Sequence, residues 1–465
     1  MTRTSVLEIA GGVRLVMPDS LNLITPYVLY EQQDWFEDEI KFLRRLLLPG
    51  QQAIDVGANY GVYTLSMAKA VGPTGSVWAF EPASSTAAFL AQGIAINEFT
   101  QVVLEPSALS RQGGTAQLTL NDNSEVNALA RAGDPAAATE TVRVVTLDEC
   151  LQRYGWQDIE LLKIDAEGEE ANIIEGGRQF LEQLSPLILY EVKAGDALHL
   201  ELVAKFTALG FDSYRLVPGL DLLVPFDATS KPDGYLLNLF CCKKDRAACL
   251  SERGLLLTAS AIASSKAEYR FEDFLEEHDH EYGWRTTLAT LPYAAACADL
   301  WESTPDGSAA IEALTCFAIS RDTHLNALER FSALESSLQS LVDLCKREPR
   351  YLRLASLARV ARDFGARTVA VTALQQLFDL LSKPKGLDPS EPFLAPGARF
   401  DTIHPRADIQ DWLRACVLEE LERLSAFSSF FTGNATRQRL ERIASLGYAS
   451  DEMQRRLLLV RTRFP

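Results

Sequence analysis

The sequence predicts an open α/β domain with a mostly parallel sheet and an antiparallel last strand, followed by an all-α domain of helical hairpins. Short apolar segments alternate with amphipathic segments over residues 52–190, which is typical of β-α-β crossovers. Two later strand-like segments, 211–217 and 234–242, could pair as an antiparallel edge. From residue 250 onward helical periodicity dominates. A chain of 465 residues is long enough for two or three such domains.

Residues 1–50 predict a hairpin and a helix that lead into the α/β domain. Residues 5–17 hold two strand-like segments around a Gly-Gly pair, which favours a hairpin. Residues 34–48 have apolar side chains at helical spacing, with acidic residues first and basic residues last. That polarity suits the helix dipole, and Pro49 ends the helix.

The α/β domain is expected to span residues 51–245, with strands and helices in alternation. The expected strands are 52–56, 76–80, 101–105, 141–145, 161–164 and 187–190. The expected helices are 60–71, 83–97, 147–155 and 169–184. This alternation predicts a parallel sheet with helices on both faces.

Residues 250–465 are expected to form the helical domain. Amphipathic segments over 349–381 indicate a pair of antiparallel helices. Residues 383–406 are rich in Pro and Gly and predict a long loop, or a link to a last helical unit. Helical hairpins often serve as binding surfaces, so we expect this half to recognise a large acceptor, bind a protein partner or form a homodimer.

Composition and residue spacing disfavour several classes of protein. The net charge of −18 disfavours nucleic acid as a partner, because binding phosphates needs clustered Lys and Arg. None of the eight cysteines forms a C-x-x-C pair, which disfavours structural zinc and indicates reduced core thiols. The N-terminus does not resemble a signal peptide, and no apolar run reaches the length of about 18 residues that spans a membrane. We therefore expect a cytoplasmic protein.

The turn after the first sheet strand carries the strongest functional signal. Asp55 precedes Gly57, Asn59 and Gly61, so the motif is D-x-G-x-N-x-G and not the G-x-G-x-x-G of dinucleotide binders. Glycines let the backbone approach a ligand closely. An acidic residue here would repel phosphates but suit a cationic ligand such as S-adenosylmethionine. A tight turn without any ligand is the alternative.

An acidic residue also ends the second sheet strand. Glu81 follows the apolar segment 77–80 and precedes Pro82. This position suits hydrogen bonds to both ribose hydroxyls of a nucleoside. NAD enzymes and methyltransferases share the feature, so Glu81 indicates a nucleoside without choosing between them; an ordinary solvated glutamate is the alternative.

A third acidic group follows a central strand in residues 160–170. Asp165 ends the strand, at the sheet edge where open α/β folds bind ligands. It could orient an acceptor, face a sulfonium or accept a hydroxyl proton as general base. Lys163 lies two residues earlier, on the same side of the strand, so an ion pair with Asp165 is possible. The following glutamates could instead only favour the start of a helix.

Taken together, DVGANYGVYTL, AFEP, TLDE, LLKIDAEGEE and LYE resemble the FkbM-type methyltransferases over residues 20–245. The resemblance implies a class I, Rossmann-like fold, S-adenosylmethionine as cofactor, and O-methylation of a sugar, glycan or natural-product acceptor. It implies that Asp165 and Glu167 lie beside the methyl-transfer site and have catalytic roles. It implies a cofactor site made of Asp55, Gly57, Ala58, Asn59, Gly61, Glu81, Pro82, Ser107, Ala108 and Asp165.

Other polar residues are weaker candidates. His199 could face the site, although a surface position suits it better, and His278 and His280 fit a solvated acidic helix better than a metal site. Asp165 and Glu167 could hold a divalent cation, but without a further ligand we expect no metal. Residues 121–140 indicate a loop over the acceptor pocket, in which Asn127 could contact the acceptor.

Two other functions compete with methyl transfer. A nicotinamide-dependent oxidoreductase is disfavoured by Asp55 and by the missing third glycine. A methyltransferase-like scaffold that has lost activity, with a helical protein-interaction domain, is disfavoured by the intact motifs. The sequence does not identify the acceptor, because specificity depends on variable loops.

Overall fold

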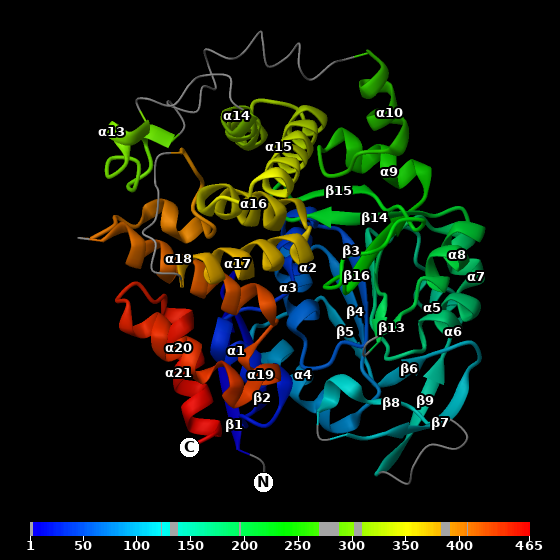
Figure 1. The fold of residues 1–465 in the computed structure, drawn as a ribbon. Coiled ribbons are helices and arrows are strands. Elements are labelled where there is room, and N and C mark those ends of the chain that lie inside the picture. Colours follow the sequence, from blue (N-terminus) through cyan, green and yellow to red (C-terminus); the bar gives the residue numbers. More distant parts are fainter. Residues whose placement is uncertain are drawn as a thin grey trace. The chain divides into compact units, whose positions relative to one another are not determined.

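A computed structural model describes residues 3–121, 123–130, 138–194, 197–268, 288–301, 309–382, 391–406 and 408–465 (Figure 1). The chain forms two compact units. The first, the α/β unit, comprises Met1–Leu216, Pro225–Pro232 and Leu236–Arg253. The second, the helical unit, comprises Val217–Val224, Asp233–Tyr235 and Gly254–Pro465.

The α/β unit is built on a mixed, mostly parallel sheet (Figure 1). In spatial order its strands are β14 (Asp212–Val217), β16 (Asn238–Cys242), β11 (Leu187–Glu191), β10 (Leu161–Ile164), β3 (Gln52–Val56), β4 (Ser76–Phe80) and β5 (Val102–Glu105). Neighbouring strands from β11 to β5 pair in parallel. Strand β16 pairs antiparallel with both β11 and β14. This confirms the predicted Rossmann-like sheet with its antiparallel last strand.

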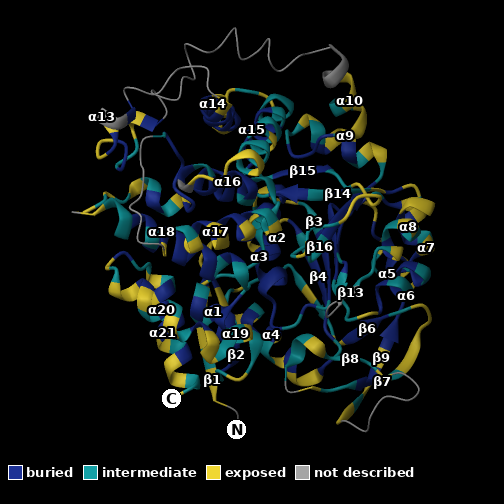
Figure 2. Ribbon diagram, in the orientation of Figure 1, coloured by how far each residue is buried: buried dark blue, intermediate teal, exposed yellow. Residues whose placement is uncertain are grey.

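Helices pack against this sheet. They are α2 (Asp38–Leu46), α3 (Val62–Val71), α4 (Ser84–Ile96), α5 (Leu147–Tyr154), α6 (Glu170–Gly176), α7 (Arg178–Gln183), α8 (Glu201–Ala208) and α9 (Lys244–Glu252). The strands are mostly buried (Figure 2). Alternate strand residues such as Ile54 and Ile164 share one core with Ile173 of α6 and Phe206 of α8. The local sequence also fixes where a helix begins: Thr146 caps the N-terminus of α5 in a capping box.

The α/β unit contains elements that the sequence analysis did not predict. Helix α1 (Ile24–Gln32) precedes α2, and its apolar residues lack the one-sided spacing of an amphipathic helix. A small second sheet has the order β6 (Ser107–Leu109), β9 (Thr139–Val145), β7 (Gly114–Thr119) and β8 (Ala128–Leu129), with a 3₁₀ turn η1 (Ser124–Val126) before β8. Only β9 has a counterpart among the expected strands.

Two short hairpins complete the strands of the α/β unit. The predicted N-terminal hairpin is present as β1 (Thr4–Ile9) and β2 (Val13–Pro18). A second, very short one consists of β12 (Lys193–Ala194) and β13 (Ala197–Leu198).

The helical unit confirms the predicted change to helices. Its described helices are α10 (Ala259–Glu268), α13 (Ala298–Trp301), α14 (Ala309–Arg321), α15 (Ala327–Arg347), α16 (Tyr351–Phe364), α17 (Arg367–Leu381), α18 (Ile409–Ser425), α19 (Ser429–Thr432), α20 (Arg437–Ser445) and α21 (Asp451–Arg463), with 3₁₀ turns η2 (Ala398–Thr402) and η3 (Gly433–Thr436). Strand β15 (Leu222–Pro225) brings Leu222 and Val224 into the same apolar core as residues of α16 and α17.

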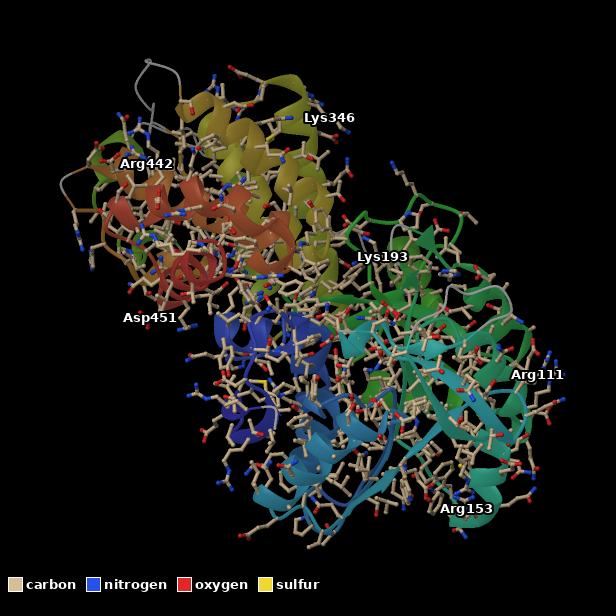
Figure 3. All side chains as sticks on the ribbon, turned by 90° about the horizontal axis from the view of Figure 1, so that it is seen from below. Arg111, Arg153, Lys193, Lys346, Arg442 and Asp451 are labelled. Atoms are coloured by element: carbon tan, nitrogen blue, oxygen red, sulfur yellow. The ribbon has the colours of Figure 1, made fainter. Side chains whose placement is uncertain are left out.

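Buried ion pairs and surface ion pairs accompany this architecture. Within the helical unit, Arg456 of α21 is fully buried and its guanidinium lies 3.5 Å from Glu422 of α18. On the α/β unit, Arg111 lies 3.6 Å from Glu175 at the surface (Figure 3). All eight cysteines are free thiols. Within the described ranges, every helix is too short or too polar to cross a bilayer.

Candidate active site

The turn between β3 and α3 has a closely packed backbone that is left-handed at its glycines. Gly57 and Gly61 have φ angles of +77° and +90°, which favour glycine. A Cβ atom on Gly57 would lie 1.7 Å from the carbonyl oxygen of Asp165, and one on Gly61 would lie 2.4 Å from Leu90. The glycines therefore let the turn pass directly against the segment that follows β10.

Glu81 fixes this turn from the end of β4. Its side chain is buried, and its two carboxylate oxygens accept the backbone N–H groups of Asn59 at 2.9 Å and of Ala83 at 2.8 Å. The N–H of Ala58 bonds the carbonyl of Phe80, so β4 holds both halves of the turn. Burial raises the pKa of Glu81 to about 7, and the charge of Asp55 adds to the rise.

Asp55 is fully buried at the end of β3, and its carboxylate contacts other buried side chains. One carboxylate oxygen accepts a hydrogen bond of 2.6 Å from Thr64, and the other lies 3.7 Å from the ammonium of Lys163. Asp55 and Lys163 are direct neighbours in the parallel register of β3 and β10. Burial raises the pKa of Asp55 above its usual range, and Lys163 opposes that rise.

Lys163 links Asp55 to Asp165. Its ammonium donates a hydrogen bond of 2.9 Å to Asp165, which confirms the predicted ion pair. The same ammonium lies 4.9 Å from the ring centroid of Tyr63, whose hydroxyl bonds Glu37 at the start of α2. Burial disfavours the charge of Lys163, but Asp165 and Asp55 outweigh it and raise its pKa. The side chain of Asp165 remains 41% exposed, so it stays accessible to a ligand.

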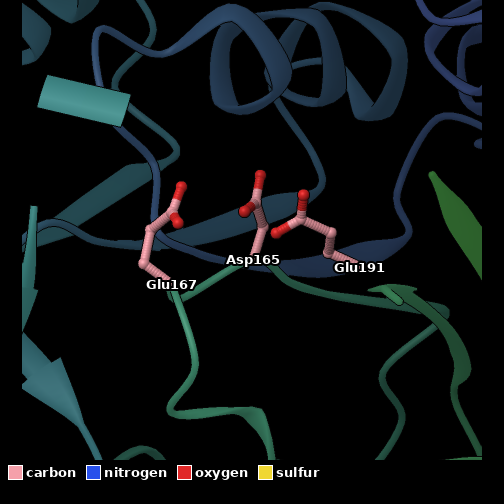
Figure 4. A group of neighbouring side chains, drawn as sticks. All are labelled: Asp165, Glu167 and Glu191. Atoms are coloured by element: carbon pink, nitrogen blue, oxygen red, sulfur yellow. The ribbon is translucent and has the colours of Figure 1, made fainter. Parts of the chain in front are cut away.

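Three carboxyl groups converge beyond the ends of β10 and β11 (Figure 4). Asp165, Glu167 and Glu191 each place an oxygen within 4.8 Å of the others. Burial raises the pKa of Glu167 to about 8 and of Glu191 to about 10, and the charge of Asp165 is the next cause in both. Like charges this close disfavour full ionisation, so the raised pKa values favour the protonated forms of Glu167 and Glu191 at neutral pH.

Comparison with known proteins identifies this region. Residues 55–213 match the family model of the methyltransferase FkbM domain. This region is an FkbM methyltransferase domain. Over 192 residues the chain is 27% identical to the methyltransferase sdnD of Sordaria araneosa, a match that covers 35% of this chain and 74% of that protein. The FkbM domain makes the protein a methyltransferase, with S-adenosylmethionine as its cofactor.

Solved structures resemble the FkbM domain only distantly. An S-adenosylmethionine-dependent O-methyltransferase from Thermotoga maritima is 12% identical, with a TM-score of 0.26, and covers 51% of this chain and 77% of its own. Aeropyrum pernix fibrillarin with bound S-adenosylmethionine is 9% identical, with a TM-score of 0.26, and covers 52% and 100%. TM-scores this low carry no information about the acceptor.

The FkbM domain has unfilled hydrogen-bonding capacity where the cofactor is expected. Ser107 and Ala108 lie on β6 and are buried. The Ser107 hydroxyl has no hydrogen-bond partner among the described residues. A buried hydroxyl without a partner is unfavourable, and the polar edge of an adenine ring would satisfy it. Together with the glycine turn, this fits a nucleoside cofactor.

The sequence analysis did not predict Glu191 of the FkbM domain as a site residue. Its signal was available, because it ends the apolar strand LILY and belongs to the LYE motif. As a third carboxylate it supplies the further ligand that Asp165 and Glu167 lacked, and three such oxygens could hold a hard cation. Because Lys163 already balances the charge of Asp165, we assign no metal to these three carboxyl groups.

Two of the remaining candidates have side-chain contacts with residues outside the three carboxyl groups. Asn127 bonds within its own loop, accepting the N–H of Asn121 at 2.7 Å. His199 is 44% exposed and lies 2.8 Å from Glu201, the surface position that the sequence favoured. His278 and His280 lie outside the described residues, as does part of the predicted loop 121–140.

Proposed function

We propose that the FkbM domain transfers the methyl group of S-adenosylmethionine to a hydroxyl oxygen of a sugar, glycan or natural-product acceptor. One observation carries the proposal. The exposed carboxylate of Asp165 is held by Lys163 at the carboxyl end of β10, and its own backbone carbonyl packs against the Gly57 turn. A charged oxygen therefore lies at the sheet edge where α/β folds bind ligands, beside the cofactor turn.

The residues that would hold the cofactor are those of the glycine turn and the strand ends around it. Gly57, Ala58, Asn59 and Gly61 would surround the methionine end, and Asp55 would support this turn from the interior. Glu81, followed by Pro82, would accept hydrogen bonds from the ribose, and Ser107 and Ala108 would flank the adenine. When bound, S-adenosylmethionine supplies an electrophilic methyl group and leaves as S-adenosylhomocysteine.

The carboxyl side chains after β10 would accept the proton that the acceptor hydroxyl loses. The acceptor hydroxyl would lose its proton to a carboxylate of the protein as its oxygen is methylated. Asp165 is the best-placed base, because the ion pair with Lys163 holds its orientation. Asp165 would then release the proton to solvent, to which its side chain is partly exposed.

The helical unit would contribute recognition. Along the chain, the last strand of the central sheet is β16, which ends at Cys242, so we expect that methyl transfer itself does not need the residues after Arg253. We propose that these helices help to bind a large acceptor, and that dimerisation or a protein partner is their other possible use.

An Asp165→Asn variant tests the proposal. Asn keeps the shape of the side chain and removes its charge. Turnover should fall by about 10²–10⁴-fold if Asp165 is the base, while affinity for S-adenosylhomocysteine changes by less than about threefold. Radiolabelled methyl transfer to a panel of hydroxyl acceptors measures the first quantity, and calorimetry measures the second. Equal losses would make Asp165 a cofactor-positioning residue instead.

A further inference from the structure

Glu125 in the turn η1 is a carboxylate with one anchored oxygen and one free oxygen. Its Oε1 accepts the backbone N–H of Thr25 at 3.0 Å and also the Thr25 hydroxyl, at the start of α1. The positive end of a helix favours a negative charge at this place. Its Oε2 is buried and has no hydrogen-bond partner within the described part of the chain.

Glu125 is held next to the cofactor turn by its neighbours. Asn123 accepts the N–H of Ile24 at 2.9 Å, which fixes the segment to α1 a second time. Ser124 donates a hydrogen bond of 3.0 Å to the side chain of Asn59 in the turn after β3. The segment therefore joins the first turn of α1 to the loop expected to receive the methionine end of the cofactor.

The charge of Glu125 also acts on Tyr60 in the glycine turn and on Glu167 after β10. Burial is the main cause that raises the pKa of Tyr60, and the Glu125 charge adds to it. The same charge adds to the raised pKa of Glu167, after burial, Asp165 and Glu170. Glu125 is thus near both features that border the expected methionine end.

We propose that Glu125 binds the α-ammonium of the methionine moiety of the cofactor, an inference that rests on the proposed cofactor site. A buried carboxylate oxygen without a donor is unfavourable, and a ligand ammonium supplies both donors and the opposite charge. The anchored Oε1 holds the side chain in place before the ligand arrives. Glu125 lies outside the motifs that suggested the other cofactor residues, and its role comes from contacts with α1.

Three ligands separate this role from a purely structural one. S-adenosylhomocysteine carries the ammonium and the carboxylate, its decarboxylated aminopropyl analogue carries only the ammonium, and 5′-methylthioadenosine carries neither. Calorimetry on the full chain should show that Glu125→Gln weakens the first two ligands by about tenfold or more, because a charge-assisted hydrogen bond is lost. The affinity for 5′-methylthioadenosine should stay within about twofold.

Matched variants test whether the change in affinity is specific to Glu125. Glu8→Gln changes an exposed carboxylate of β1 and should leave all three affinities unchanged. Glu81→Gln should weaken all three ligands, since each carries the ribose. Should Glu125→Gln fail to fold, Glu125→Asp keeps the charge on a shorter side chain and should show the same selectivity.

Each other outcome overturns the inference. A loss for S-adenosylhomocysteine alone would show that Glu125 does not recognise the ammonium, and an equal loss for all three ligands would make it only a structural link. Unchanged affinities would mean that it does not touch the cofactor. If the wild-type chain binds none of the three ligands, the proposed cofactor site itself is wrong, which is a distinguishable failure.

Discussion

The ammonium of Lys163 donates a hydrogen bond of 2.9 Å to the carboxylate of Asp165, two residues farther along the chain. Strand geometry puts both side chains on one side of the sheet. Lys163 is almost fully buried, whereas Asp165 is 41% exposed. The pair therefore presents a charged oxygen to ligands while its cation stays in the interior, next to Asp55.

Replacing Lys163 with Met should destabilise the fold strongly. The change leaves the fully buried Asp55 without its cation, and breaking a buried pair in this way costs about 3–5 kcal/mol. Urea denaturation of the two proteins measures the difference. Lys205→Met is the matched control: its partner Glu175 is 3.1 Å away at the surface, so its loss should cost less than about 1 kcal/mol. Equal losses of stability in the two variants would show that the buried pair contributes no more to stability than the surface pair.

Cofactor affinity should depend on pH through Glu81. Its pKa is raised from 4.5 to about 7 in the folded chain, so Glu81 holds a proton there at pH values where the unfolded chain has lost it. Its contribution to folding stability is fully present below pH 4.5 and is lost as pH rises through about 7. Ribose hydroxyls bond the ionised form better, so binding should improve over the same range.

Calorimetry of S-adenosylhomocysteine checks this dependence. Affinity at pH about 6 should be roughly tenfold weaker than at pH about 8, and binding at the lower pH should release protons. Glu81→Gln should bind weakly at both values without proton release. A wild-type affinity that does not vary with pH would show that Glu81 does not bind the ribose.

Removing the residues after Arg253 should expose apolar surface on the remaining fragment. Val217, Leu220, Leu222 and Val224 belong to the core of the helical unit although they precede Arg253. A fragment 1–253 should therefore bind a hydrophobic dye and associate in sedimentation experiments. Replacing these four residues with Ser or Thr should restore a monomer. A monomeric, dye-free fragment without those replacements would contradict the grouping of 217–224 with the helices.

Chelation should leave methyl transfer unchanged. We expect the site to work without a divalent cation, because the ammonium of Lys163 lies 2.9 Å from Asp165 and supplies a positive charge there. Rates before and after EDTA treatment measure this directly. A loss of activity that Mg²⁺ restores would establish Asp165, Glu167 and Glu191 as metal ligands.

Local signals were sufficient to predict most of the central sheet. Strand β10 is a short apolar run followed by charged residues, and α2 begins with acidic and ends with basic residues, so each follows from neighbouring positions. The glycine turn was equally readable, because positive φ angles demand glycine. The three-residue strand β6 was not, since so short a segment forms only through its pairing with β9.

Apart from Glu191, the residues of the site that the sequence analysis missed depend on contacts between distant positions. Glu125 and Thr25 are 100 positions apart, and neither has a local pattern that marks it as functional. Glu37 likewise looks like an ordinary helix-starting residue until Tyr63 bonds it. Burial by other elements changes the chemistry of such carboxylates, and one sequence does not show it.

The most direct test of methyl transfer to oxygen uses S-adenosylmethionine with a ¹³C-labelled methyl group. The full-length chain is incubated with a panel of hydroxylated sugars, glycans and natural products, and the products are read by carbon NMR. The account predicts a methoxyl signal from the wild type and a signal weaker by at least about 10²-fold from Asp165→Asn. Label found on nitrogen or carbon, or full turnover by the Asp165→Asn variant, would contradict it.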